Sequence, residues 1–223
     1  MNSFVKLLFS VGLFCALFFP ASFTEAASKY GDEALELGAA GDSVTILQED
    51  LQKLGYLGKS SITGNYDEET EKAVIKFQSD HGIEENGKVG PGTGLHIQKE
   101  LAKQEKPQTI VKTAMDLKGT PYAWGGTSPS GFDCSGFVSY VYAKNDIQLP
   151  HSAKEMYKTG SSIPAPEIGD LVFFSTYASY PSHVGVYIGN NQFISSTTNR
   201  GVKVDSLSDS YWKSRYLGAK RVI

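Results

Sequence analysis

The spacing of apolar residues changes along this chain of 223 residues. Residues 37–103 carry apolar side chains at helical spacing, as in Val44, Leu47 and Leu51. In the C-terminal half the alternating pattern of strands dominates, for example over residues 183–188. Helices followed by strands are typical of an α+β architecture. We therefore expect a small helical domain, followed by a domain in which helices pack on an antiparallel sheet.

The first half predicts three helices joined by glycine turns. The second helix is expected to begin after Asp67, a good N-cap, and to end at Gly82, and the third is expected at about 93–103. A short repeat, TGNYDEET at 63–70 and NGKVGPGT at 86–93, places a glycine turn before each of these two helices. About seventy residues are enough for a compact three-helix unit.

The N-terminus has the features of a secretory signal peptide. Lys6 supplies a positive charge, residues 7–20 are almost wholly apolar, and Ala26 is a small residue suited to cleavage. The apolar run is too short to span a membrane comfortably. We expect a signal peptide over residues 1–26, a secreted mature protein, and no integral membrane segment after cleavage.

Cleavage at this point leaves one cysteine, Cys134, because Cys15 lies in the apolar run. Such a cysteine in an oxidising compartment is a buried filler residue, an intermolecular link or a reactive thiol. Cys134 stands at the expected start of a helix, with Asp133 as the N-cap. Free backbone N–H groups at a helix N-terminus stabilise a thiolate and an oxyanion. These features favour a nucleophile whose pKa is lowered.

A cysteine nucleophile needs a base, and the candidates are His151 and His183. His151 lies in a loop, where an exposed imidazole is the simpler interpretation. His183 begins the alternating strand, and Gly185 leaves space on the same face. His81 and His96, in the helical half, have no further ligands at a suitable spacing, so no metal is expected.

The net charge of −3 is unevenly distributed. Residues 27–106 contain 9 Lys and Arg against 15 Asp and Glu, whereas residues 107–223 contain 11 against 8. This asymmetry suggests two domains. Without a basic run it does not predict nucleic acid as a partner. The polar segment around Pro107 predicts a short linker, given as residues 104–108, or a helix end.

The motifs of the first domain resemble the peptidoglycan-binding domain found beside many cell-wall hydrolases. They lie between residues 37 and 101 and are GDSVTILQ, LGY, GNY before a helix ending in KFQ, and NGKVGP. The resemblance implies that the three-helix domain at 37–103 binds peptidoglycan.

The motifs of the second domain resemble the NlpC-type cell-wall cysteine peptidases, which are papain-like. In chain order they are GTPYAWGGTSPSGFDCSGFV, LPHSA, GDLVFF and SHVGVYIGNNQFI. The resemblance implies a papain-like domain at 109–223 that cleaves stem peptides of peptidoglycan. The usual bond lies between D-γ-glutamate and the diamino acid. It further implies catalysis without a cofactor, and we expect a monomer that is secreted and associated with the cell wall.

The family's site residues carry over motif by motif. Cys134 corresponds to the nucleophile and His183 to the base. Tyr122 corresponds to a tyrosine that lines the substrate pocket and the oxyanion site. Asp133 and Ser135 correspond to residues that hold the amino end of the stem peptide.

Ser195 stands where the family usually has a third polar residue, most often histidine. We expect Ser195 to orient His183 by accepting a hydrogen bond from its Nδ1–H, directly or through one water. This requires both side chains on one face of a hairpin. A three-residue turn at 189–191 would pair Gly185 with Ser195 and meet the requirement, whereas a two-residue turn at 190–191 would not.

The sequence leaves three interpretations of the second domain open. The first is an active D,L-endopeptidase, and the second is an amidase or acyl transferase on the same fold. The third is a non-catalytic wall-binding protein. His151 also replaces the arginine of the family's usual Leu-Pro-Arg motif, and the sequence offers no reason for this change.

Overall fold

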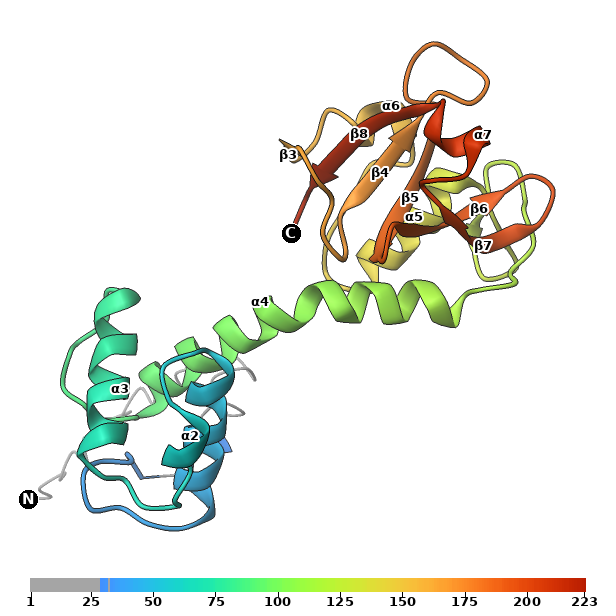
Figure 1. Cartoon of the computed structure of the whole chain (residues 1–223). Helices are drawn as coiled ribbons and strands as arrows, with labels where there is room; N and C mark the ends of the chain where they lie inside the picture. Colours follow the sequence, from blue (N-terminus) through green and yellow to red (C-terminus); the bar gives the residue numbers. More distant parts are fainter. Residues whose placement is uncertain (1–28, 32) are drawn as a thin grey trace, which may run out of the picture. The chain divides into compact units, whose positions relative to one another are not determined.

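The computed structural model describes residues 29–31 and 33–223, so the expected signal peptide and Cys15 lie outside the described residues. The chain divides into two compact units, Met1–Leu101 and Ala102–Ile223. Figure 1 shows the elements of each unit. Within the described residues, we find no helix with both the length and the apolar character needed to cross a membrane.

The first unit is helical, as predicted, and its second helix is capped by Asp67, whose side chain accepts a hydrogen bond from Thr70 N–H at 2.9 Å. Its core consists of apolar side chains from the faces that the helical spacing predicted. They include Val44, Leu47, Leu51, Val74, Phe77 and Ile97, each no more than 1% exposed. The described elements are α2 (Asp42–Lys53), the 3-10 helix η1 (Lys59–Ser61), α3 (Glu68–Asp80) and the first part of α4 (Pro91–Asp116).

Two buried glutamines hold the two glycine turns of the internal repeat in the same way. Gln48 of α2 accepts a hydrogen bond from the N–H of the turn glycine at 2.9 Å and donates one to Thr70 Oγ1 at 2.9 Å. Gln78 of α3 repeats these contacts at the next turn, at 3.0 Å from the glycine and 3.1 Å to Thr93 Oγ1. Both glutamines are fully buried. The sequence repeat is therefore also a structural repeat, in which a buried glutamine forms the same hydrogen bonds to each glycine turn and to the threonine that follows it.

Residues 104–108, predicted as a short linker or a helix end, lie inside a helix. Helix α4 is continuous from Pro91 to Asp116 and contains Pro107. Polar composition suggested a linker, but lysine, glutamine and glutamate also have high helix propensity. Tertiary contacts reinforce the helix, because Lys106 Nζ donates to the backbone carbonyl of Asn145 at 2.9 Å.

The second unit contains a six-stranded antiparallel sheet with the strand order β3-β8-β4-β5-β6-β7. This confirms the predicted α+β fold class. The strands of this sheet are β3 (Ser161–Ile163), β4 (Leu171–Phe174), β5 (His183–Gly189), β6 (Gln192–Thr197), β7 (Gly201–Ser206) and β8 (Tyr216–Arg221). The remaining elements are the short pair β1 (Thr127–Ser128) and β2 (Gly131–Phe132), and the helices α5 (Cys134–Ala143), α6 (Ala153–Met156) and α7 (Ser210–Lys213).

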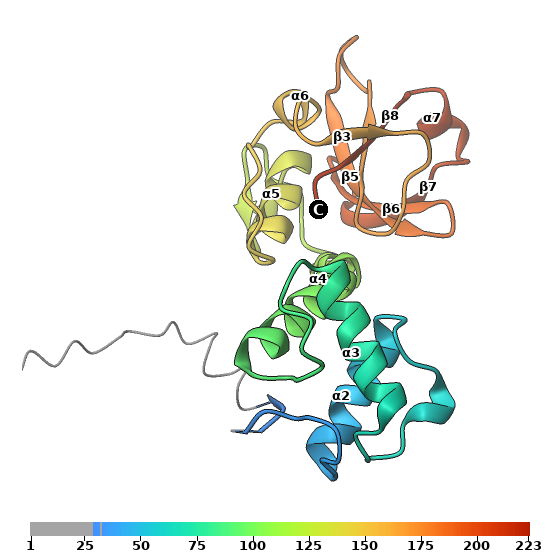
Figure 2. The same ribbon diagram turned by 90° about the vertical axis from the view of Figure 1, so that its left-hand side faces the viewer.

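Helices cover both faces of this sheet. Figure 2 shows α5 beside the sheet on the side away from α7. The apolar face of α5, including Phe137 and Val141, packs on one sheet face in a cluster with Val184 and Val186. On the opposite face, Trp212 of α7 packs in a second cluster, together with Val172, Phe174, Phe193 and Ala219.

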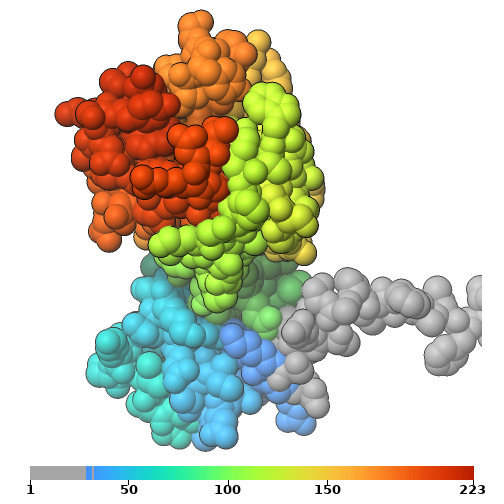
Figure 3. Space-filling model, turned by 90° about the vertical axis from the view of Figure 1, so that its right-hand side faces the viewer, coloured from blue at the N-terminus to red at the C-terminus, as the bar shows by residue number. Residues whose placement is uncertain are grey.

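The loop that precedes β1 is hydrogen-bonded to β7. Gly119 N–H donates to the carbonyl of Val202 at 2.8 Å, and Val202 N–H donates to the carbonyl of Thr120 at 2.9 Å. Gly201 has a positive φ of 62°, and a Cβ there would lie 2.1 Å from the Thr120 carbonyl oxygen, so only glycine permits this approach. Figure 3 shows the two segments in contact on one face of this unit. The contact brings the Tyr122 loop beside the strands that carry the site.

Candidate active site

Cys134 is the first residue of α5, as the sequence predicted. Asp133 is the N-cap, and its Oδ1 accepts a hydrogen bond from Gly136 N–H at 2.6 Å. The helix end also fits closely against the preceding loop, because a Cβ at Gly136 would lie 2.0 Å from the carbonyl oxygen of Gly126. Glycine at this position therefore allows the loop and the helix end to meet beside the thiol.

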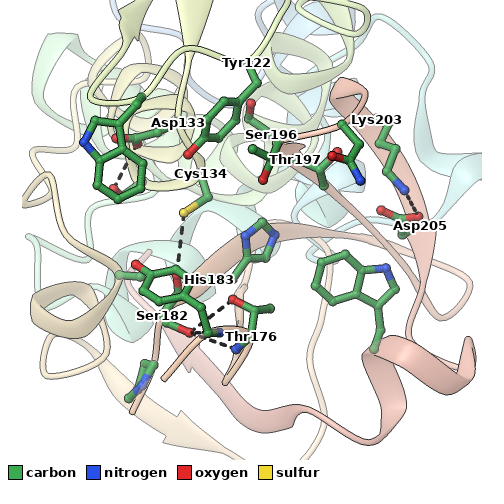
Figure 4. A pocket seen from close by; sticks show the side chains of 18 of the residues that line it. Tyr122, Asp133, Cys134, Thr176, Ser182, His183, Ser196, Thr197, Lys203 and Asp205 are labelled. Atoms are coloured by element: carbon green, nitrogen blue, oxygen red, sulfur yellow. Dashed lines mark hydrogen bonds and ion pairs between the residues drawn. The ribbon is translucent and has the colours of Figure 1, made fainter. Parts of the chain in front are cut away.

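The thiol of Cys134 lies against the residues on either side of His183. Its Sγ is 4.0 Å from the carbonyl oxygen of Ser182, and the backbone N–H of Val184 favours its charged form. The helix end therefore meets the beginning of β5. Figure 4 shows the side chains of Cys134 and His183 next to each other in the pocket.

The pKa of Cys134 differs from the expectation. Burial raises the pKa of the thiol to about 11, and the negative charge of Asp133 adds to this effect. The backbone N–H groups at the helix end act in the predicted, opposite direction, but they are outweighed. The sequence revealed the helix end without showing how deeply the sulfur is buried. In the free protein the thiol is therefore protonated near neutral pH.

His183 is buried at the start of β5, with 8% of its surface exposed. Burial lowers the pKa of its imidazole to about 4, and the positive charge of Lys203 contributes in the same direction. Trp212 stacks on the ring at a centroid distance of 5.0 Å. The imidazole is therefore neutral near pH 7, the form that can accept a proton.

Ser195 holds the ring of His183 from the neighbouring strand. Its Oγ lies 3.0 Å from His183 Nε2, and the serine is completely buried. The hydrogen bond is direct, which is one of the two expected arrangements, the other being a bond through one water. It involves Nε2, however, and not the predicted Nδ1. With Ser195 accepting the Nε2–H, Nδ1 is the ring nitrogen left to take a proton.

The hairpin reaches the predicted register by a different route. Gly189 pairs with Gln192, so the turn contains two residues, Asn190 and Asn191, which both have positive φ (50° and 58°). The predicted three-residue turn is therefore wrong. A register shift between Tyr187 and Gly189 compensates, and beyond it Val186 pairs with Ile194. This bulge brings Ser195 opposite Gly185, on the same face as His183.

Gly185 has a structural role on this face. A Cβ at this position would lie 2.7 Å from Phe193 Cδ2 and 3.1 Å from Ser195 Cβ. Any larger residue would therefore separate β5 from β6 at the point where Ser195 reaches His183. The sequence suggested open space beside the imidazole, and the structure shows that the space is taken up by the adjacent strand.

Five of the six predicted site residues line one cavity of about 710 Å³. They are Tyr122, Asp133, Cys134, Ser135 and His183. Ser195 is not part of the lining, and its hydroxyl contacts the imidazole of His183. Burial, followed by the charges of Cys134 and Asp133, raises the pKa of Tyr122, so its hydroxyl stays protonated as a potential hydrogen-bond donor.

The structure gives a reason for His151, which the sequence did not explain. His151 Nε2 lies 3.0 Å from both carboxylate oxygens of Asp133. Asp133 Oδ1 also accepts hydrogen bonds from Gly136 N–H and, at 3.1 Å, from Ser135 Oγ. His151 is therefore the exposed loop residue that the sequence suggested, and its imidazole is also a partner of the N-cap carboxylate beside the nucleophile.

Several residues of the cavity carry no clear signal in the sequence. Trp124, Tyr177 and Tyr180 line it with exposed aromatic rings, and Lys203 and Asp205 line it from β7. The aromatic residues lie in loops, where no periodicity marks them. The β7 pair could have been found from the alternating pattern, because residues 203 and 205 share one face of a strand.

The histidines of the first unit have local roles. His81 Nδ1 lies 2.8 Å from the carbonyl of Phe77, and His96 Nδ1 lies 2.9 Å from that of Gly92. Throughout residues 29–31 and 33–223, no group of three or more His, Cys, Asp or Glu side chains is placed to hold a metal ion.

A thiol at a helix N-terminus beside a buried histidine on an antiparallel sheet is the arrangement of papain-like cysteine hydrolases. Residues 119–221 match the model of the NlpC/P60 family, and residues 40–94 match a model described as "Putative peptidoglycan binding domain". The second domain thus belongs to the NlpC/P60 family, and the chain joins it to a peptidoglycan-binding domain.

Curated relatives match about half of the chain. "Probable peptidoglycan endopeptidase LytE" of Bacillus subtilis is 54% identical over 112 residues, which are 50% of this chain and 33% of that protein. "Murein DD-endopeptidase MepH" of Escherichia coli is 43% identical over 134 residues, which are 55% of this chain and 49% of that protein. The chain thus spans less than half the length of either relative. The solved structure of an NlpC/P60 family protein from Bacillus cereus has 31% identity and a TM-score of 0.49, covering 52% of this chain and 39% of that one.

Proposed function

We propose that this protein is a peptidoglycan endopeptidase that uses Cys134 as its nucleophile and His183 as its base. The observation that carries the proposal is the contact between the N-terminus of α5 and the start of β5, with the thiol beside a neutral imidazole held by Ser195. Relatives of the second domain that are named as endopeptidases support the reaction type.

The proposed reaction begins from a neutral pair, because burial disfavours both the thiolate and the imidazolium. His183 Nδ1 takes the proton of Cys134 as the sulfur attacks the carbonyl carbon of the scissile amide. Backbone N–H groups at the N-terminus of α5 stabilise the oxyanion. His183 then gives the proton to the leaving amine, and water hydrolyses the thioester to release the acid and restore the thiol.

Ser195 is proposed to support the imidazole when it becomes positively charged. It keeps the Nε2–H occupied, so that Nδ1 is directed to proton transfer. Trp212 stacks on the ring and restricts its rotation. A serine hydroxyl is neutral, so its stabilisation of the imidazolium is weaker than that of a carboxylate.

The proposed substrate is a stem peptide of peptidoglycan, cut between D-γ-glutamate and the diamino acid. Asp133 and Ser135 would hold the amino end of the stem peptide, and Tyr122 would line the substrate pocket and the oxyanion site, as the family resemblance implies. A relative from Bacillus subtilis that is 38% identical over 122 residues is named "Gamma-DL-glutamyl hydrolase", which supports this bond. The first domain, proposed over residues 37–103, would bind the wall and keep the catalytic domain close to it. We place the protein outside the cell, as a wall-associated monomer.

Product analysis tests the bond. Purified peptidoglycan is digested with the protein, and the soluble products are identified by mass spectrometry, with Cys134→Ala as the blank. The proposal predicts new fragments whose amino terminus is the diamino acid. Fragments cut at a D-alanyl bond would show a different endopeptidase specificity. Release of intact stem peptides from the glycan would identify an amidase instead.

A further inference from the structure

Strand β7 carries a charged pair on the face of the sheet that holds the base. Lys203 lies directly opposite Ser195 in the β6–β7 register, and Asp205 lies opposite Phe193. Residues opposite each other in an antiparallel pair, and residues two apart in a strand, share one face. Lys203 and Asp205 therefore lie on the same face as Ser195 and His183.

The two side chains form an ion pair within the wall of the active-site cavity. Lys203 Nζ contacts Asp205 Oδ1, and the exposed fractions of the two side chains are 26% and 10%. In the described part of the chain, the buried Oδ2 of Asp205 has no hydrogen-bond partner. Figure 4 shows the pair on the side of His183 away from Asp133. The ion pair with the Asp205 carboxylate therefore holds the ammonium of Lys203 in place.

A fixed cation near a buried imidazole acts on the charge of that imidazole. Two positive charges repel each other more strongly where the surroundings exclude water, so Lys203 disfavours the imidazolium. Burial, followed by the charge of Lys203, lowers the pKa of His183. Asp205 offsets part of this repulsion, because its negative charge lies beside the ammonium.

In the described part of the chain, Lys203 is the one cation whose charge contributes to the lowered pKa of His183, although Lys154 and Arg200 also line the cavity. Cys134 faces it from α5, with the negative Asp133 behind the thiol. Ser195 of β6, Phe174 of β4 and Trp212 of α7 complete its surroundings with uncharged side chains. Asp209, which precedes α7, lines the same cavity and carries a negative charge.

We propose that Lys203, fixed by Asp205, is a positioning residue that keeps His183 in its neutral, proton-accepting form in acidic surroundings. The pair thereby sets the lower pH limit at which the thiol can react. This inference rests on the proposed roles of Cys134 and His183, and it assigns a function to a charged pair outside the family motifs.

Alkylation of Cys134 by iodoacetamide tests the inference without using a substrate. The rate of alkylation is measured as a function of pH in the full chain. The acid limb is the part of this pH–rate profile in which the rate rises from low pH, and it reports the first proton lost by the thiol–imidazole pair. Lys203→Met should move this limb upward by about one pH unit. Lys203→Arg keeps the charge and should leave the limb in place. Lys118→Met removes the same charge from an exposed position outside the cavity lining and should also leave it in place.

Asp205→Asn is expected to shift the acid limb in the opposite direction. It preserves the shape of the side chain but leaves the charge of Lys203 uncompensated, so the acid limb should move to lower pH. An unchanged limb in Lys203→Met, or upward shifts in both the Lys203→Met and Asp205→Asn variants, would overturn the inference. Such results would leave the proposed hydrolysis intact, because muropeptide cleavage is measured separately.

Discussion

Replacing Ser195 by alanine isolates the contribution of one hydrogen bond to the base. The substitution removes an oxygen that lies 3.0 Å from His183 Nε2 and is fully buried, so solvent does not readily replace it. Leaving a buried polar group without its partner costs about 1–3 kcal/mol. Part of this cost is already present in the free enzyme, and the remainder appears when the imidazole becomes charged.

We therefore expect Ser195→Ala to lower kcat/KM about tenfold, which corresponds to about 1.4 kcal/mol. The assay is the steady-state cleavage of a defined soluble muropeptide, with the free energy of unfolding measured in parallel. Ser195→His, which restores the residue usual in the family, should retain or exceed the activity of the wild type.

The neighbouring serine is a matched control. Ser196 is also fully buried, but it follows Ser195 in the strand and so faces the other side of the sheet, and its hydroxyl donates to the carbonyl of Phe132 at 2.7 Å. Ser196→Ala should lower stability without a comparable loss of kcat/KM per folded molecule. Equal turnover of wild type and Ser195→Ala would refute the claim that Ser195 orients His183.

Two further predictions follow from the buried base and from the two-domain organisation. The pKa of His183 is about 4 in the folded protein and near 6.5 when unfolded, so the unfolded state takes up the proton first as the pH falls. The free energy of unfolding should thus decrease from pH 6.5 to 4 by up to roughly 3 kcal/mol, and His183→Gln should remove most of this slope in chemical denaturation. Deletion of residues 27–101 should reduce activity on insoluble walls much more than on small soluble muropeptides, because tethering raises the effective concentration only at the wall. Equal losses on both substrates would argue against a targeting role.

The elements with a local signal in the sequence were predictable. Asp67 and Asp133 are short acidic residues immediately before helical runs, and both are N-caps in the structure. The alternation at 183–188 marked β5, and the fold class followed from the order of helical and strand patterns. These features depend on neighbouring residues, so they are visible without tertiary information.

Features that depend on tertiary burial were not predictable in the same way. The helix end suggested a lowered thiol pKa at Cys134, but desolvation by the packed sheet outweighs the backbone N–H groups. The polar segment at 104–108 suggested a linker or a helix end, yet the helix continues through it, and Lys106 contacts the Asn145 carbonyl just after α5. The turn after β5 was wrong by one residue, and a bulge that no local pattern indicated restored the register of Ser195.

The proposed function depends most on Cys134 acting as the nucleophile. Its most direct test is the rate at which purified peptidoglycan is cleaved by wild type and by Cys134→Ala, with folding checked by circular dichroism and wall binding by co-sedimentation. If Cys134 is the nucleophile, the alanine variant folds and binds the wall but releases no fragments above the uncatalysed background. Cleavage by Cys134→Ala at a rate comparable to wild type would contradict this role.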